Sequence, residues 1–173
     1  MRAARLLLLL LSACGVSPAT TIETPTHEVV LGPPPGWTFE PAAGSGAAIL
    51  LEPVLLEDTR AVFALRPGGL GPLHGVAFRL VFDPAAAELV GFQPSSDWAS
   101  APLVKVVEAR PGTVVGVLSR HGPTGAVVAA ELGRIELKLK GAQPVTLRLE
   151  RTRAQADFGA KIDAVWRAGV LRR

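Results

Sequence analysis

Apolar and charged side chains alternate strictly over two neighbouring stretches late in the chain. Residues 135–140 read Ile-Glu-Leu-Lys-Leu-Lys, and residues 145–150 read Val-Thr-Leu-Arg-Leu-Glu. Because successive side chains of a β-strand point to opposite faces of its sheet, each stretch predicts a strand with one buried and one solvated face. The connection at 141–144 is of hairpin length and contains Gly and Pro. The two stretches are therefore expected to be adjacent antiparallel strands.

The same patterning recurs at short intervals along most of the chain. Turn-forming residues such as Pro67-Gly68-Gly69 and Arg110-Pro111-Gly112 separate the stretches. The further expected strands cover residues 61–65, 76–82, 88–92, 104–107, 113–119 and 164–171. Short strands at this spacing predict an all-β fold, either an antiparallel β-sandwich of the jelly-roll or immunoglobulin-like kind or a barrel. Residues 126–132 fit a helix as well as a strand.

One face of the expected strand at 76–82 is uniformly large and apolar. It carries Val76, Phe78, Leu80 and Phe82. Each such side chain contributes roughly 1.5 to 3 kcal/mol when it is buried. This strand is therefore expected at the centre of the hydrophobic core.

The first fourteen residues have the layout of an export signal. Two arginines precede an apolar run at 6–11, which small residues and the single cysteine, Cys14, follow. The run is too short to span a bilayer, which takes about 20 apolar residues. Residues 11–14, Leu-Ser-Ala-Cys, resemble the lipobox of bacterial lipoproteins. The alternatives are an ordinary signal peptide that contains a cysteine, or a cysteine buried in an N-terminal helix.

The lipobox resemblance implies that residues 1–13 are removed and that Cys14 is acylated. Each methylene group buried in the bilayer contributes about 0.8 kcal/mol, and stable anchoring takes at least two acyl chains. A triacylated cysteine would therefore hold the chain to a membrane. Gly15 in place of an aspartate resembles lipoproteins that are sent to the outer membrane. The expected location is therefore the outer membrane or the cell surface, with a lipid anchor.

Processing would remove most of the apparent basicity. The whole chain has 18 Lys+Arg against 15 Asp+Glu, and loss of Arg2 and Arg5 would leave 16 against 15. This near balance lacks the basic footprint that nucleic-acid binding requires, so no nucleic-acid partner is expected.

Residues 14–46 are expected to form a tether. The segment contains the Pro-rich piece 32–36 and the Gly-rich piece 42–46, which are typical of extended and flexible linkers respectively. Residues 27–31 and 37–39 fit a short strand and an apolar clamp on the domain as well as they fit disorder. Residues 47–173 are expected to form the folded domain.

A family resemblance rests mainly on residues 73–84, Leu-His-Gly-Val-Ala-Phe-Arg-Leu-Val-Phe-Asp-Pro, followed by Glu88-Leu89-Val90. This segment resembles one of cohesin modules and related cellulose-binding modules, in which an alternating strand ends in Phe/Tyr-Asp-Pro. Residues 133–140, 145–149 and 158–171 resemble the later strands, so the resemblance covers residues 47–171. It departs at Ala87, where the family usually has a large aliphatic residue.

The resemblance implies a β-sandwich with a non-catalytic binding role. In cohesins the partner is a dockerin, recognised through one sheet face, and in the cellulose-binding relatives it is a polysaccharide. No interface residue can be transferred, because the family's contact positions lie outside the matched motif. A structural lipoprotein of the envelope, in which the sandwich is only a spacer, is a third hypothesis.

No catalytic residue, metal ligand or cofactor is expected. His27, His74 and His121 lack the spacing of a metal helix or a nucleophile motif. Ser119 lies only two residues before His121, which is more typical of a strand end running into a turn. Asp83 has no second carboxylate at a calcium-binding spacing and is expected to form a turn.

Trp98 is the candidate for sugar binding. It lies in the polar stretch 93–102, and an exposed aromatic ring can stack on a pyranose. Burial is the more frequent fate of a tryptophan, and the low aromatic content argues against a broad sugar-binding surface.

Overall fold

The computed structural model describes residues 36–99, 103–120 and 126–173. The strands of the first half are β1 (Thr38–Pro41), β2 (Ala48–Glu57), β3 (Arg60–Gly68), β4 (Gly75–Val81) and β5 (Ala87–Pro94). Those of the second half are β6 (Leu103–Arg110), β7 (Thr113–Ser119), β8 (Gly133–Leu139), β9 (Val145–Gln155), β10 (Lys161–Ile162), β11 (Val165–Arg167) and β12 (Gly169–Arg172). The helical turns are α1 (Ser96–Ala99) and the 3-10 turn η1 (Asp157–Gly159).

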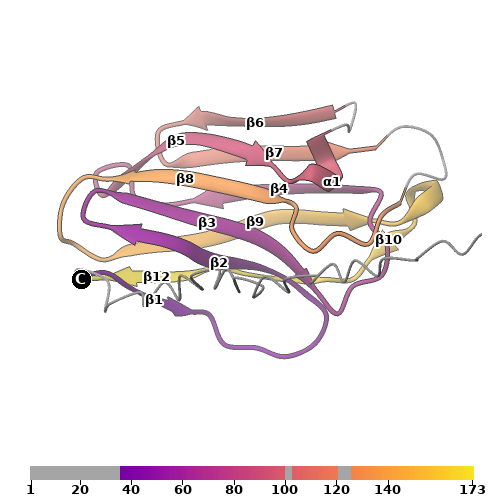
Figure 1. Ribbon diagram of the computed structural model, residues 1–173, viewed down its shortest axis with the longest axis horizontal. Helices are drawn as coiled ribbons and strands as arrows, with labels where there is room; N and C mark the ends of the chain where they lie inside the picture. The colour runs from indigo at the N-terminus through magenta and orange to yellow at the C-terminus, as the bar shows by residue number, and fades with distance from the viewer. Residues whose placement is uncertain (1–35, 100–102, 121–125) are drawn as a thin grey trace, which may run out of the picture. The chain divides into compact units, whose positions relative to one another are not determined.

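The strands form two sheets that pack against each other (Figure 1). One sheet has the order β1-β12-β9-β4-β7-β6, with β10 paired to β9, and the other has the order β11-β2-β3-β8-β5. The parallel β11–β2 pair is an exception among antiparallel pairs. This arrangement confirms the all-β sandwich that the alternating pattern predicts.

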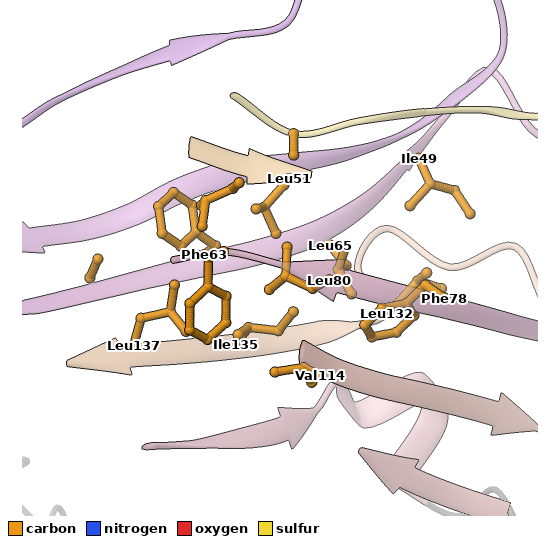
Figure 2. Packing of buried hydrophobic residues seen from close by; sticks show 14 of the residues in the cluster. Ile49, Leu51, Phe63, Leu65, Phe78, Leu80, Val114, Leu132, Ile135 and Leu137 are labelled. Atoms are coloured by element: carbon orange, nitrogen blue, oxygen red, sulfur yellow. The ribbon is translucent and has the colours of Figure 1, made fainter. Parts of the chain in front are cut away.

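A single cluster of apolar side chains fills the space between the sheets, as Figure 2 shows. Phe78 and Leu80 project into it from β4, and Phe63 projects into it from β3. Phe78 is 2% exposed, and its ring centroid lies 6.2 Å from that of Trp166. The expectation that β4 is a core strand is therefore confirmed.

The C-terminal stretch differs from the prediction. The pattern predicts one strand over 164–171, whereas the structure divides it at Ala168 into two strands of different sheets. β11 pairs with β2, and β12 pairs with β1 and β9. Residues 164–171 are apolar apart from Arg167, so the sequence does not reveal that the chain crosses between the sheets.

Gly169 allows β1 to approach β12 closely. A Cβ there would overlap the backbone oxygen of Glu40 and would lie 2.7 Å from Cζ of Phe39. We expect Gly169→Ala to destabilise the domain by about 1 to 3 kcal/mol, because β1 must move away from β12. Thermal denaturation followed by circular dichroism measures the effect. Gly91→Ala is the control, since nothing lies within 4 Å of its Cβ position; an equal loss in both variants would contradict this account.

Part of the expected tether belongs to the sandwich. Trp37 is fully buried, and its Nε1 donates a hydrogen bond to the backbone oxygen of Asp58 at 3.2 Å. Phe39 packs on Phe63 with ring centroids 5.2 Å apart. Residues 37–41 thus belong to the sandwich, and the apolar clamp at 37–39 is present. The possible strand at 27–31 lies outside the described residues.

Two further segments depart from the pattern. Residues 126–132 form no helix where they are described; Val127 makes an isolated antiparallel bridge to Leu73. The alternation predicts no strand over 48–57, where the structure has β2, because a bulge between Pro53 and Leu55 interrupts the period of two.

Among the described residues, no helix is long and apolar enough to cross a membrane.

Candidate functional site

Trp98 does not form an exposed platform. It lies on α1 with none of its surface exposed, while its neighbours Ser96 and Asp97 are exposed. The helical turn thus directs the polar residues outward and the ring into the core, which is why the polar stretch around Trp98 does not indicate exposure. Trp37 is fully buried and Trp166 is half-buried. Cys14, the expected lipidation site, lies outside the described residues.

The residues considered for chemistry have structural roles where they are described. One carboxylate oxygen of Asp83 accepts a hydrogen bond from the backbone N–H of Ala85 at 2.8 Å, which confirms that Asp83 is a turn former. The hydroxyl of Ser119 donates to the backbone oxygen of Arg120 at 3.3 Å, and His121 lies outside the described residues. Within the described ranges, no three His, Cys, Asp or Glu side chains are grouped as metal ligands.

The outer face of β6, β7, β4 and β9 combines aliphatic and basic side chains, and we call it the basic face. The antiparallel register arranges its residues in rows that cross the four strands. One row contains Lys105, Val117, Ala77 and Arg153. The next contains Val107, Val115, Arg79 and Glu150. Since neighbouring strands lie about 4.8 Å apart, each row spans roughly 15 Å.

Aliphatic side chains occupy the middle and one edge of the basic face. Val115 and Val117 of β7 are half-buried, while Leu103 and Val107 of the edge strand β6 are 47% and 43% exposed. Gly116, between the two valines, faces inward against the ring of Phe78. The valines therefore point away from the core and remain available for contact.

The charges of the basic face are strongly biased. Its register positions carry the basic residues Arg79, Lys105, Arg110, Arg148 and Arg153. Glu150 is the acidic residue at these positions, and its Oε1 lies 3.4 Å from Nε of Arg148. No described carboxylate lies within 4.0 Å of the other four basic groups. The outer surface of these strands therefore presents cations that have no acidic partner among the described residues.

The outer face of β2, β3, β8 and β5, which we call the opposite face, has a different electrostatic character. Its charges pair with one another: Nε of Arg60 lies 2.8 Å from Oε1 of Glu136, and Nζ of Lys140 lies 2.8 Å from Oε2 of Glu88. The hydrogen bond from Arg60 lowers the pKa of Glu136, and the one from Lys140 lowers the pKa of Glu88. Most charges of the opposite face thus have a partner, with Lys138 as an exception, whereas four of the five basic groups of the basic face have no described carboxylate within 4.0 Å.

No family model and no curated protein matches the sequence of the chain. Structure comparison finds cohesin modules at low identity. The sixth cohesin of scaffoldin B from Acetivibrio cellulolyticus, solved with a Cel5 dockerin variant, has a TM-score of 0.63 at 9% identity and covers 72% of this chain and 97% of its own. A type I cohesin from Clostridium thermocellum, solved as the Coh-OlpC-Doc435 complex, has a TM-score of 0.59 at 14% identity, with coverages of 76% and 96%.

A third similar structure comes from outside cellulosomes. The non-cellulosomal cohesin of the archaeon Archaeoglobus fulgidus has a TM-score of 0.55 at 10% identity and covers 72% of this chain and 89% of its own. Each of these modules matches over most of its length, so the likeness concerns the whole sandwich and not a shared hairpin. The chain therefore has the β-sandwich fold of cohesin modules.

Proposed function

We propose that this chain is a non-catalytic protein-binding module, that a dockerin-type protein is its partner, and that the basic face is its contact surface. Two of the similar cohesins were solved with dockerins, which supports this class of partner. The observation that carries the choice of face is the contrast in pairing: Arg60 and Lys140 have carboxylate partners on the opposite face, while Arg79 and Lys105 have none among the described residues. Interfaces of this kind combine aliphatic contacts with charges that the partner must complement.

The test uses the full chain, purified in detergent and immobilised. The Cel5 dockerin and the Doc435 dockerin are the soluble probes, and calorimetry gives their affinity. Saturable binding of either dockerin supports the proposal. Binding of neither, together with retention of the chain on insoluble cellulose, would favour the polysaccharide hypothesis instead.

We further propose that lipid at Cys14 anchors the module to a membrane. The support is the sequence Leu-Ser-Ala-Cys after a short apolar run, with two arginines before it. The outer membrane is the proposed destination, since Gly15 follows the cysteine.

Cys14→Ser is expected to release the protein from the membrane. Without the sulfur no thioether-linked lipid forms, and the affinity of the acyl chains for the bilayer is lost. Fractionation of cells followed by immunoblotting measures the distribution, and mass spectrometry of the parent protein measures the added acyl mass. A Cys14→Ser protein that remains in the membrane fraction would contradict lipid anchoring, whatever the dockerin experiment shows.

A further inference from the structure

We infer that the partner contacts the basic face through an acidic surface, in which carboxylates surround aliphatic side chains. This inference rests on the proposed function, since it assigns the chemistry of the partner at the same face.

The first argument is the segregation of charge. Without Arg2, Arg5, Glu23 and Glu28, the chain carries 16 basic and 13 acidic residues, a net charge of +3. The basic face alone, with five basic residues and Glu150, carries +4. The rest of the domain is therefore close to neutral. A field of one sign over a single sheet face attracts an acidic surface and repels a basic one.

The second argument is the position of Arg79. It lies half-buried on β4, an inner strand, where the register places it between Val115 and Glu150. Its Nε is buried and has no hydrogen-bond partner among the described residues. A guanidinium stays charged at any physiological pH. A partner that covered Arg79 with apolar surface alone would remove its remaining hydration without replacing it, so binding needs an acceptor there.

The third argument concerns the class of the acidic partner. Leu103, Val107, Val115 and Val117 lie between the basic residues, and an aliphatic surface of this kind matches the apolar part of a protein interface. A single-stranded nucleic acid would instead need aromatic rings for base stacking. The outward positions of these four strands that the register defines carry no aromatic residue. A protein surface therefore fits better than a phosphate polymer.

The experiment compares three peptides that share the same aliphatic residues. Glutamates flank these residues in the first peptide, lysines in the second and glutamines in the third. The full chain in detergent is titrated with each peptide, and affinity is measured by fluorescence anisotropy. We expect the glutamate peptide to bind at least tenfold more tightly than the lysine peptide. We also expect this binding to weaken about tenfold as added salt shortens the screening length from about 30 Å to about 3 Å.

Charge reversal at single lysines tests whether the peptide binds to the basic face. Lys105→Glu is expected to weaken binding of the glutamate peptide about tenfold, because one attraction becomes a repulsion. Lys138→Glu is the matched control, since Lys138 is an exposed lysine of β8 on the opposite face and the net charge changes equally. We expect Lys138→Glu to leave the affinity within about twofold of the parent chain.

Three results would overturn the inference. In the first, the glutamate peptide binds no more tightly than the lysine peptide. In the second, Lys105→Glu and Lys138→Glu weaken binding equally, which indicates attraction by net charge alone. In the third, heparin competes at lower concentration than the glutamate peptide, which assigns the face to a sulfated or phosphate polymer. If a dockerin binds the face but the lysine peptide is preferred, the proposed function stands and only the acidic partner is excluded.

Discussion

Replacing Phe78 with aspartate is expected to abolish the cooperative unfolding transition of the domain. The ring of Phe78 is buried between the sheets, packs on Trp166 and covers Gly116 of the neighbouring strand, where a Cβ would lie 2.8 Å from Cε2 of the ring. Truncating a buried phenylalanine costs about 3 to 5 kcal/mol, and an unpaired buried carboxylate adds several more. The sum approaches the whole stability of about 5 to 15 kcal/mol that a domain has.

Thermal denaturation followed by near-ultraviolet circular dichroism measures this loss. Phe158→Asp is the matched control, because Phe158 is 78% exposed and has a backbone φ of 56°, which aspartate tolerates better than phenylalanine. We expect the control to melt at or near the temperature of the parent protein. A Phe78→Asp protein with a sharp transition would show that the core does not depend on β4 in the way the packing indicates.

The sequence predicts this part of the fold well because each inner strand has one buried and one solvated face. The predicted strand 113–119 coincides with β7, and the predicted strand 76–82 differs from β4 by one residue at each end. In both strands every second side chain projects into the core. A period of two is then the direct consequence of burial, and it is visible without any knowledge of neighbouring strands.

The same reasoning fails where both faces of a strand are partly covered or where the period is interrupted. β2 carries Leu50 and Leu55 on its outer side, both only half-exposed, and a bulge shifts its register after Pro53. β11 and β12 lie in one nearly continuous apolar stretch, residues 164–171, although they belong to different sheets. Local pattern records which side of a strand is buried. It does not record which strand lies beside it.

The basic face could not be predicted from the sequence, because it depends on which strands lie side by side. Lys105 and Arg153 are separated by 48 positions in the chain and share one row of the sheet only because β7 and β4 lie between their strands. The sequence shows which face of each strand is charged, but it does not show which of these faces combine into one surface. For Trp98 the sequence pattern is misleading in the other direction: the residue lies in a polar stretch, which suggests an exposed ring, yet its side chain packs in the core.

Val117→Asp is expected to leave the domain folded and to remove binding at the basic face. Val117 lies on β7, next to Lys105 on one side and Ala77 on the other, and its side chain points away from the core. The change in strand propensity costs about 1 kcal/mol, so the cooperative melt persists. The binding affinity falls for two reasons. An aliphatic contact at the centre of the face is lost, and the new carboxylate neutralises Lys105 and repels an acidic partner.

The loss at such a central position is expected to reach about 2 kcal/mol, or roughly thirtyfold in affinity for the glutamate-flanked peptide. Val90→Asp is the control, since Val90 is a 56% exposed valine at the bulge of β5, in the other sheet. It should melt normally and bind the peptide as the parent chain does. An unchanged affinity in Val117→Asp would remove the basic face from consideration as the contact surface. If the affinity falls as expected, aspartate substitution separates the two sides of one sheet: at Phe78 it acts on folding, and at Val117 it acts on recognition.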